Sequence, residues 1–469
     1  MAGLRVKLIA LLMNDQENNV PDFNRRDFLK NGSVATLMTM LGGVELFGET
    51  STAAEAEGSP DKTIKVGLIG LGSWGREILN TLLQVPQADV AAICDTYAAS
   101  VRRAASLAPK AAQTNDHQTI LDNQEIKAVV IATPTYQHKD LVLAALKAGK
   151  HVYCEAPLAS TIEDAKAIAL AAKAAKQQVF QTGLQFRADP QRHFLVPFIR
   201  SGAIGNWLSC RAQFHKKQSW RTTSPKPERE KELNWRLSKE TSSGLVGELG
   251  IHPIDEAVWF MNAQPTAVSG FGTIALWKDG RDVPDTIKSI LEFPGGVIMS
   301  YDATLANSFD GEYAMFYGTD AAVMLRESKA WLFKEVDSPL LGWEVYASKE
   351  VFYKETGIVL KANASKSVPA NAGAQAQESP YSNTPLFHSL QVFLRNGIDV
   401  TDKVEEATNL LGAEDKEGIA AEVAKVQRQL RAAAGYLEGF ESAVTAIKAN
   451  EAILTGQRIV LKPEWYELG

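Results

Sequence analysis

The chain has 469 residues, of which 45% are hydrophobic, and a formal net charge of −6. This length is enough for two ordinary domain cores, while the acidic balance and the lack of a basic stripe with interleaved aromatic residues argue against nucleic acid as a partner. The histidines are scattered without metal-ligand spacing, so no metal site is predicted, and three cysteines without CxxC spacing are expected to be buried thiols: Cys94, Cys154 and Cys210.

Residues 1–56 have the order of features found in an export signal. Two arginines, Arg25 and Arg26, precede a mildly apolar stretch at 34–47, and a small-residue AEA sequence ends at Ala56. This order resembles a twin-arginine translocation signal with cleavage after Ala56, the alternative being a disordered tail. The apolar stretch is shorter than the roughly 18 residues that a membrane span needs. The sequence therefore predicts an exported, periplasmic protein without a stable membrane span.

A glycine-rich turn follows the first strand-like segment after the predicted signal. The sequence KVGLIGLGSWGRE at 65–77 passes from an apolar strand pattern through three glycines into a helix pattern. In a dinucleotide-binding turn, the first glycine allows the tight bend, the second lets the backbone approach the pyrophosphate, and the third lets the helix pack closely on the strand. The sequence predicts such a turn at Gly70, Leu71, Gly72, Ser73, Trp74 and Gly75.

An acidic residue follows the second apolar run. Asp95 lies 20 residues after Gly75, the spacing at which a carboxylate reaches the adenosine ribose hydroxyls. A carboxylate accepts hydrogen bonds from a free ribose diol and repels the additional phosphate of NADP. The sequence therefore favours NAD over NADP. Arg102 and Arg103 could turn toward a phosphate, although they fit better on the solvated face of the next helix.

The region 62–182 alternates short β-branched runs with longer amphipathic stretches. This alternation is typical of a parallel sheet covered by helices on both faces. The sequence predicts an α/β fold here, an N-terminal Rossmann domain with a doubly wound parallel sheet. The expected strands contain Val66, Val90, Val129, 151–154 and 178–182, and the expected helices begin at Trp74, Ala98, His138 and Ile162.

From Gly183 onward the pattern changes to longer alternating strands separated by Pro and Gly turns, with a hairpin turn expected at PGG, 294–296. The sequence predicts a C-terminal α+β domain over 183–469 with a large, mostly antiparallel open sheet. The Ala-, Ser-, Asn- and Pro-rich stretch 362–383 predicts a mobile loop. Strands are expected at 207–214, 268–277, 287–293, 297–303 and 458–461, and a long helix at 405–442.

Further motifs accompany the glycine turn. They are Ala-Thr-Pro at 132–134 followed by His138, Glu-Ala-Pro at 155–157, GLQFR at 183–187, Trp-Arg at 235–236, and GLVGELGIHPID at 244–255. Together with the glycine turn, they resemble the Gfo/Idh/MocA oxidoreductases, which are named for glucose-fructose oxidoreductase and inositol dehydrogenase. The resemblance covers nearly all of the chain after the predicted signal.

The resemblance implies which residues surround the nicotinamide. In such enzymes the turns after two parallel strands lie beside this ring, where the ligands of doubly wound sheets bind. Thr133, Pro134, His138 and Glu155 are therefore expected cofactor-binding residues. For the side chains of Thr133 and Pro134 the alternative is that they only cap the helix beginning at His138.

The resemblance also points to catalytic groups, with one departure from the family. The family's Glu-Lys-Pro tripeptide carries a lysine that is implicated in catalysis, and this chain has Ala156 in its place. The family's Asp and His positions hold Glu248 and His252, which share a face if the stretch is helical. His252 is the expected general base, because histidine titrates near about pH 6.5. Asp255 is expected to orient it or to bind substrate hydroxyls; the alternative is a structural His252–Asp255 pair.

A sugar or polyol site is expected next to these groups, since indole rings stack on sugar faces and charged side chains bind hydroxyls. Its expected substrate contacts are Arg187, His215, Trp235 and Arg236, with Lys216, Lys217 and Trp220 as further candidates. Relatives commonly associate through the open sheet, so a homo-oligomer formed by the C-terminal sheet is expected as well.

Three functions fit these features. The first is an exported, NAD-dependent oxidoreductase that acts on a sugar, polyol or glycoside, with a tightly bound cofactor recycled on the enzyme. The second is a redox-neutral glycoside hydrolase or lyase that uses the same cofactor through a keto-sugar intermediate. The third is a non-catalytic, nucleotide-bound sugar-binding protein, because the family's lysine is missing at Ala156.

Overall fold

The computed structural model describes residues 62–224, 226–326, 329–341, 344, 347–352, 355–360 and 383–469. The predicted export signal at 1–56 lies outside the described residues, as does the predicted loop at 362–383 except for its last residue. None of the helices in the described ranges is long and apolar enough to cross a membrane.

Six parallel strands form the first sheet, sheet A, in the order β3-β2-β1-β4-β5-β6. The central strands β4 and β5 are buried along their whole length, which explains their continuous apolar sequences. The predicted Rossmann fold is confirmed; β3 and α6 are additional short elements. The strands are β1 Ile64–Ile69, β2 Ala88–Cys94, β3 Ala112–Thr114, β4 Ala128–Ile131, β5 His151–Cys154 and β6 Phe180–Thr182; the helices are α4 Ser73–Leu82, α5 Ala98–Ala105, α6 Gln118–Asp122, α7 His138–Lys147 and α8 Ile162–Ala174.

Sheet B has ten strands in the order β14-β15-β13-β12-β11-β7-β10-β9-β8-β16. Its pairs are antiparallel except β7 with β10, which confirms the predicted, mostly antiparallel sheet. The predicted hairpin turn joins β9 to β10. The strands are β7 Trp207–His215, β8 Ala267–Thr273, β9 Thr286–Glu292, β10 Ile298–Thr304, β11 Glu312–Gly318, β12 Ala321–Arg326, β13 Lys329–Lys334, β14 Lys349–Phe352, β15 Glu355–Leu360 and β16 Ile459–Val460.

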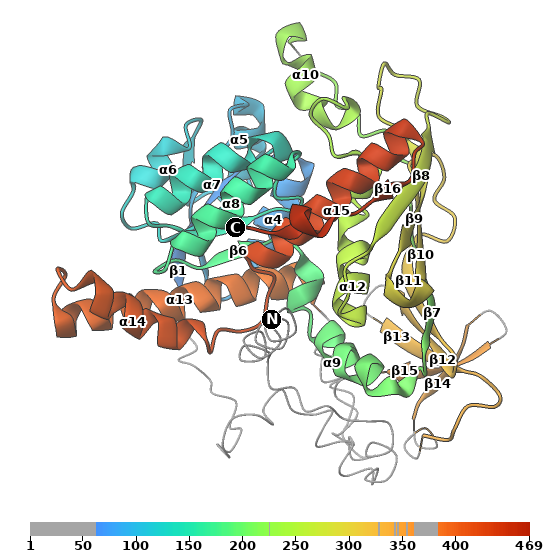
Figure 1. Cartoon of the computed structure of the whole chain (residues 1–469). Helices are drawn as coiled ribbons and strands as arrows, with labels where there is room; N and C mark the ends of the chain where they lie inside the picture. Colours follow the sequence, from blue (N-terminus) through green and yellow to red (C-terminus); the bar gives the residue numbers. More distant parts are fainter. Residues whose placement is uncertain are drawn as a thin grey trace, which may run out of the picture.

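Helices cover the inner face of sheet B and share its apolar core. One of them, α15 (Tyr436–Thr455), also packs on α8 and so lies between the two halves of the molecule (Figure 1). The three predicted buried thiols are buried and unpaired, as expected. The other elements here are α9 Pro190–Phe198, η3 Ile199–Ala203, α10 Glu230–Leu233, α11 Gly244–Glu248 and α12 Ile251–Met261, with short helical turns η1 Thr135–Gln137, η2 Gln185–Ala188, η4 Pro227–Arg229, η5 Trp235–Leu237, η6 Pro294–Gly296 and η7 Pro463–Tyr466.

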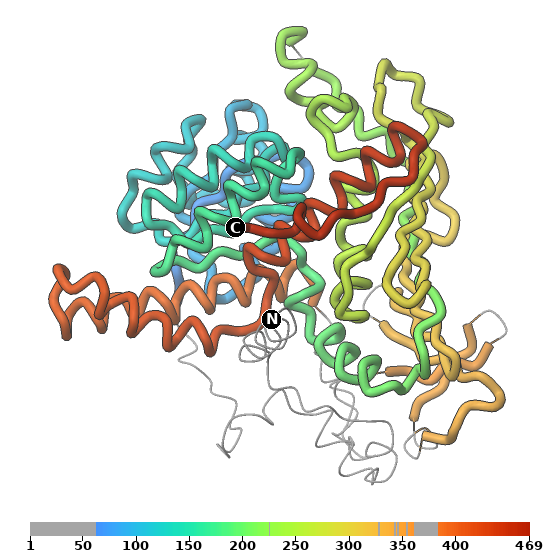
Figure 2. The backbone as a smooth tube through the Cα atoms, in the orientation of Figure 1, coloured from blue at the N-terminus to red at the C-terminus, as the bar shows by residue number. Residues whose placement is uncertain are grey.

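The single long helix predicted at 405–442 is wrong. The helix α13 (Pro385–Leu411) ends at Gly412, whose φ of +87° does not continue a helix, and α14 (Lys416–Gln427) begins where the Asp415 side chain accepts from the Gly418 N–H. The tube in Figure 2 shows this part of the chain returning to the half that contains sheet A. There α13 packs its apolar face on the core beneath β1.

The strand predicted at 268–277 is also shorter in the structure, because β8 ends at Thr273. The buried Asp285 carboxylate accepts hydrogen bonds from the backbone N–H groups of Ala275, Leu276 and Trp277, at 2.7–2.9 Å. These bonds satisfy three donors that would otherwise continue the strand ladder, and they hold the pKa of Asp285 below its usual range despite burial. The chain therefore turns away from sheet B at this point.

Candidate active site

The glycine turn lies between the end of β1 and the start of α4. Gly70 has a φ of +99°, and a Cβ there would lie 2.5 Å from the carbonyl oxygen of Ala132. A Cβ on Gly75 would lie 2.0 Å from the carbonyl oxygen of Gly70. At Gly72 the position of a Cβ meets no atom of the described residues within 4 Å. The turn is thus closely packed on two sides and open at the helix N-terminus, where a pyrophosphate binds.

The different surroundings of Gly72 and Gly75 predict that substitutions at these two positions affect nucleotide binding and folding differently. The backbone of Gly72 (φ −60°, ψ −170°) is allowed for alanine, so Gly72→Ala is expected to leave the free energy of unfolding unchanged. Its methyl group would project into the open space and raise the Kd for NADH about tenfold or more. Fluorescence titration with NADH and urea unfolding measure the two effects. The matched variant Gly75→Ala is expected to destabilise the fold; equal stability losses in both variants would contradict this assignment.

Asp95 lies directly after β2, where the sequence places it. Its two carboxylate oxygens accept hydrogen bonds from the backbone N–H groups of Leu71 (2.8 Å) and Tyr97 (2.7 Å). The side chain therefore joins the glycine turn to the turn after β2. Its predicted contact with the ribose hydroxyls stays a prediction.

The buried His138 joins the two turns that are expected beside the nicotinamide. Its Nδ1 lies 3.0 Å from the carbonyl oxygen of Pro157, and its Nε2 lies 3.0 Å from that of Thr133. Burial lowers the pKa of His138. Both ring nitrogens are used within the protein, so His138 positions the turns.

Among the buried polar atoms that have no hydrogen-bond partner among the described residues are Thr133 Oγ1, Glu155 Oε1 and His252 Nδ1. Thr133 and Glu155 follow the carboxyl ends of β4 and β5, and His252 is in α12. Ala156, the residue after Glu155, packs against a buried apolar cluster that includes Ile251, the residue before His252. Buried polar groups in proteins are nearly always paired, so unpaired ones at adjacent elements indicate a ligand. With the open glycine turn, these atoms fit a nicotinamide dinucleotide and a hydroxylated substrate.

Burial raises the pKa of the Glu155 carboxyl to about 7, against opposing contributions from Trp74, the Ala156 backbone and the Arg236 charge. A carboxyl group with this pKa is available near neutral pH both as a donor and as an acceptor. Either form can bind an amide such as the nicotinamide carboxamide.

His252 is a half-buried imidazole whose pKa burial lowers to about 4, opposed by the charge of Asp255. The ring is therefore neutral at physiological pH, as a general base must be. Its ring centroid lies 5.8 Å from that of Phe186.

Asp255 is fully buried and does not bond to His252. Its oxygens accept hydrogen bonds from Arg187 Nε (2.8 Å), Arg187 Nη2 (2.9 Å) and Ser442 Oγ (2.7 Å). Next to it, Glu256 pairs with the buried Arg192 at 2.9 Å. The predicted pair of His252 and Asp255 is thus replaced by ion pairs that hold α12 against the segment after β6. A direct role of Arg187 with substrate stays a prediction.

The i, i+4 geometry expected for Glu248 and His252 is wrong, because a break separates α11 from α12. Glu248 is the last residue of α11, and Leu249 and Gly250 form the break. At Gly250 a Cβ would lie 2.6 Å from the ring of Tyr301, so this close approach needs glycine. Glu248 instead pairs with Arg236, its Oε2 lying 3.1 Å from Nε. Burial raises the pKa of Glu248, and the charge of Arg236 opposes this shift.

The structure does not bring His215 to this site. Its Nε2 lies 2.7 Å from Oδ2 of Asp302, which is on the outward-facing side of β10. Because paired residues of adjacent strands share a face, His215 lies on the outer face of sheet B, opposite α12. The expected substrate contacts of Lys216 and Lys217 stay predictions. Trp235 is buried, with its ring 6.5 Å from that of Tyr136 after β4.

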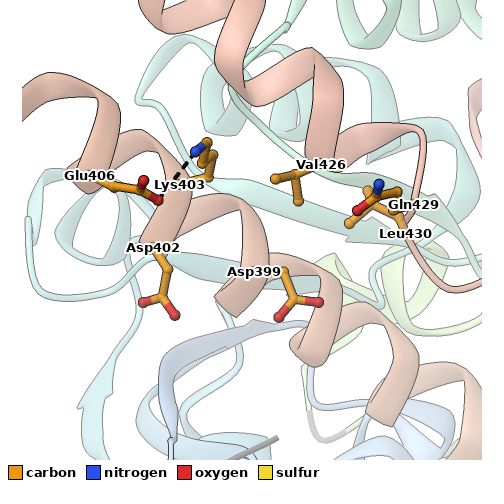
Figure 3. Close-up of a pocket in the computed structure, with 7 residues that line it drawn as sticks. All are labelled: Asp399, Asp402, Lys403, Glu406, Val426, Gln429 and Leu430. Carbon is orange, nitrogen blue, oxygen red and sulfur yellow. Dashed lines mark hydrogen bonds and ion pairs between the residues drawn. The ribbon is translucent and has the colours of Figure 1, made fainter. Parts of the chain in front are cut away.

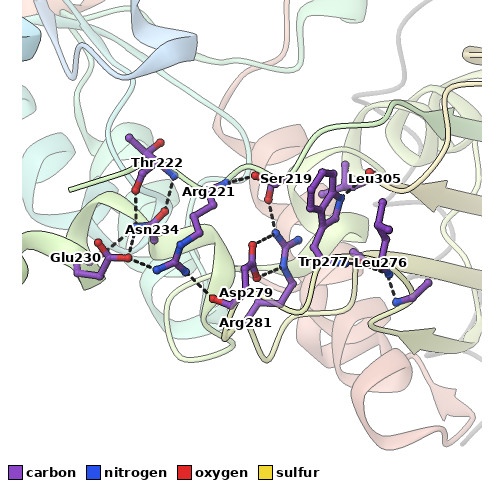
Figure 4. A network of polar contacts seen from close by, with 12 residues as sticks. Ser219, Arg221, Thr222, Glu230, Asn234, Leu276, Trp277, Asp279, Arg281 and Leu305 are labelled. Atoms are coloured by element: carbon purple, nitrogen blue, oxygen red, sulfur yellow. Dashed lines mark hydrogen bonds and ion pairs between the residues drawn. The ribbon is translucent and has the colours of Figure 1, made fainter. Parts of the chain in front are cut away.

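The segment that contains the substrate candidates Trp220 and Trp235 also connects sheet B with the nucleotide-binding turns. Residues 219–235, of which residue 225 lies outside the described ranges, are fixed to the loop after β8 by a polar network (Figure 4). Arg221 donates to the Asp279 carbonyl (2.7 Å) and pairs with Glu230, while Arg281 pairs with Asp279 (2.7 Å) and donates to the Ser219 carbonyl. The sequence did not predict these polar contacts, and the only signal for them is the density of charged residues in this segment.

The far end of this segment reaches sheet A. Arg229 donates to the carbonyl oxygen and to Oγ1 of Thr96, both at 3.1 Å, and its guanidinium lies 5.0 Å from the ring centroid of Tyr97. Glu232 accepts from Arg229 at 2.5 Å. Thr96 and Tyr97 directly follow Asp95, so the segment covers the end of the nucleotide site that is expected to hold the adenosine.

A hollow of about 390 Å³ between α13 and α14 is unrelated to these groups (Figure 3). Its lining includes Asp399, Asp402 and Lys403, and Asp402 pairs with Lys62 at 2.7 Å. Because Lys62 precedes β1, the hollow lies at the amino ends of the strands, whereas the glycine turn lies at their carboxyl ends. Within the described ranges, moreover, no group of three or more His, Cys, Asp or Glu side chains is arranged to hold a metal ion.

Comparison with known families agrees with the fold and with the nucleotide-binding turn described above. Residues 64–183 match the profile described as "Oxidoreductase family, NAD-binding Rossmann fold", and residues 196–324 match the "GFO/IDH/MocA C-terminal domain". The two matches together cover more than half of the chain and confirm NAD as the predicted cofactor.

Individual relatives are more distant. The chain is 30% identical over 234 residues to levoglucosan dehydrogenase of Pseudarthrobacter phenanthrenivorans. This match covers 45% of this chain and 58% of that protein. It is 26% identical over 270 residues to 1,5-anhydro-D-fructose reductase of Ensifer adhaerens, with 55% and 75% covered. The chain thus spans little more than half the length of the first of these relatives.

Solved structures share the whole fold. Levoglucosan dehydrogenase in complex with NADH and L-sorbose superposes with a TM-score of 0.60 at 19% identity, covering 86% of this chain and 99% of that one. Aldose-aldose oxidoreductase from Caulobacter crescentus, complexed with glycerol, gives 0.59 at 16% identity, with 85% and 100% covered. The profile matches, together with this fold and the predicted motifs, show that the chain belongs to the Gfo/Idh/MocA family of oxidoreductases.

Proposed function

We propose that this protein is an NAD-dependent oxidoreductase that interconverts a secondary alcohol and a ketone on a sugar, polyol or glycoside. The observation that carries the proposal is the group of buried, unpaired polar atoms of Thr133, Glu155 and His252 beside an open glycine turn. The names of the relatives, among them dehydrogenases of levoglucosan and inositol, support a carbohydrate substrate.

Several side chains of this protein have distinct roles in the proposed reaction. Bound NAD supplies the hydride acceptor. His252, neutral because burial lowers its pKa to about 4, accepts the hydroxyl proton as the alcohol is oxidised. Thr133 and Glu155 offer an unpaired hydroxyl and an unpaired carboxyl oxygen for the nicotinamide carboxamide. His138 keeps the two turns that carry these groups together.

A panel of substrates tests the proposal. The purified protein with NAD is incubated with levoglucosan, myo-inositol and D-sorbitol, and with NADH plus 1,5-anhydro-D-fructose, while absorbance at the NADH band is followed. Sustained formation or consumption of NADH with one of them supports the proposal. Binding of NADH without turnover of any carbohydrate in the panel or of any nitrophenyl glycoside favours the non-catalytic sugar-binding alternative.

A second candidate reaction is redox-neutral cleavage of a glycoside. Oxidation at a ring carbon acidifies the neighbouring C–H, the aglycone leaves, water adds, and the hydride returns to the sugar. The replacement of the family's lysine by Ala156 is a departure from the usual alcohol-oxidising site, and this departure motivates the second candidate. Release of nitrophenol from nitrophenyl glycosides without net NADH formation identifies it.

Retention of the cofactor through several turnovers is part of the proposal. The contact between Arg229 and the Thr96 turn supports it, because adenosine release then needs movement of the 219–235 segment. Arg229→Ala is expected to raise the dissociation rate of NADH about tenfold, equivalent to the loss of one charge-assisted hydrogen bond of about 1.5 kcal/mol. Stopped-flow displacement measures this rate. Lys231→Ala, on the exposed surface of α10, is the matched control, and equal rates in both variants would argue against retention by this contact.

Export by the twin-arginine route and self-association also belong to the proposal. The order of features around Arg25 and Arg26 supports export, and fractionation of cells that carry the Arg25→Lys/Arg26→Lys variant tests it: the variant should stay in the cytoplasm. Exposed Ile290 and Ile298 on adjacent strands of the outer face of sheet B support a homo-oligomer, which light scattering detects.

A further inference from the structure

Arg236 lies between the carboxylates and aromatic rings of the candidate site. Its Nε donates to Glu248 Oε2 at 3.1 Å, and its guanidinium lies 4.4 Å from the ring centroid of Trp235 and 5.7 Å from that of Trp220. One third of the side chain is exposed. Two indole faces and one carboxylate therefore fix the orientation of a guanidinium that still has access to a ligand.

The charge of Arg236 acts at the turn where the family's lysine is missing. Burial raises the pKa of both Glu155 and Glu248, and the charge of Arg236 opposes this rise at each of them. The charge of Arg236 also lowers the pKa of His138, whose ring bonds to the carbonyl of Pro157. Position 156, between Glu155 and Pro157, carries only a methyl group. Arg236, in the segment after α10, thus supplies the positive charge that Ala156 cannot supply.

The unused donors of Arg236 match a neutral hydroxylated ligand. No described residue accepts a hydrogen bond from its terminal nitrogens, which leaves four N–H groups available in a planar fork. The carboxylate of Glu248 already compensates the positive charge of Arg236, so this guanidinium would add little binding free energy for an anionic ligand. A guanidinium that donates next to a carboxylate that accepts is complementary to the hydroxyls of a polyol.

We propose that Arg236 takes over the part of the missing lysine by donating a hydrogen bond to the substrate oxygen that is oxidised or reduced. This inference rests on the proposed function. As the alcohol is oxidised, its O–H proton passes to His252 and its C–H hydride to NAD, while Arg236 stays protonated and stabilises the negative charge that develops on the oxygen. Glu248 acts as a positioning residue that orients the guanidinium.

Substitutions that move the cation back to the family position test this role. Arg236→Gln is expected to lower kcat about 10²–10³-fold, the usual cost of losing one donor to a developing oxyanion, while KM changes less than about threefold. Arg236→Lys should retain part of the activity, because a cation with donors remains. The double variant Arg236→Gln/Ala156→Lys should regain at least about tenfold in kcat over Arg236→Gln, since the ammonium then projects from position 156.

Controls separate this role from folding and from the proposed function. NADH titration of each variant should match the parent. Urea unfolding should show that each variant is folded, although Arg236→Gln leaves the buried Glu248 without its cation. Arg458→Gln, which removes an exposed arginine on Glu292, should keep full activity. A kcat within threefold of the parent in Arg236→Gln overturns the inference, as does a double variant with no recovery although it binds NADH normally. A parent protein that turns over none of levoglucosan, myo-inositol, 1,5-anhydro-D-fructose and nitrophenyl glycosides refutes the proposed function instead.

Discussion

Replacing His252 by alanine is expected to lower kcat for carbohydrate oxidation about 10²–10⁴-fold, the usual contribution of a general base. The imidazole has a buried Nδ1 without a partner among the described residues, and no ion pair of α12 depends on it. The Kd for NADH and the free energy of unfolding should therefore change little. Steady-state kinetics with NADH titration measures this, and His252→Gln serves as the variant of closer volume.

The pH dependence of the parent checks the same assignment. Burial lowers the pKa of His252 from about 6.5 to about 4, so the ring remains an available base down to about pH 4. The acidic limb of kcat/KM for oxidation should therefore have its midpoint near pH 4 and fall as the pH falls. Burial raises the pKa of Glu155 to about 7, so this group titrates separately. In the Glu155→Gln variant, the acidic limb of kcat/KM therefore reports His252 alone. A limb near pH 6.5 in that variant would contradict a base whose pKa is lowered by burial.

Replacing Asp255 by alanine is expected to destabilise the fold by about 3–5 kcal/mol, the range for breaking a buried ion pair. Asp255 is 1% exposed and its partner Arg187 14%, so the substitution leaves a guanidinium buried without its bidentate acceptor. Ser442 loses its acceptor at the same time. Urea unfolding measures the change in the free energy of unfolding.

A surface pair is the matched control for this prediction. Glu292 and Arg458 also form a bidentate pair, but both are largely exposed, and Glu292→Ala should leave the unfolding midpoint unchanged. If Asp255→Ala were as stable as the parent and lost only kcat, Asp255 would be a catalytic residue, as the sequence had suggested.

The sequence by itself determined the nucleotide fold, because its signals are local. The bend at Gly70 and the close packing at Gly75 need glycine for reasons of sterics within a few residues. The strands β4 and β5 are buried on both faces, so each reads as a continuous apolar run. The position of Asp95 follows from the length of one strand–helix–strand unit.

The partners of the catalytic candidates were decided only by the tertiary structure. Asp255 is three residues from His252, yet it bonds to Arg187 and Ser442, which are 68 and 187 residues away in the chain. His215 is separated from the site by the alternation of side chains across sheet B. Arg236 meets Glu248 because the break at Leu249–Gly250 ends α11 there. A sequence pattern specifies which groups are present; long-range packing specifies which of them meet, because burial rewards paired charges wherever the chain brings them together.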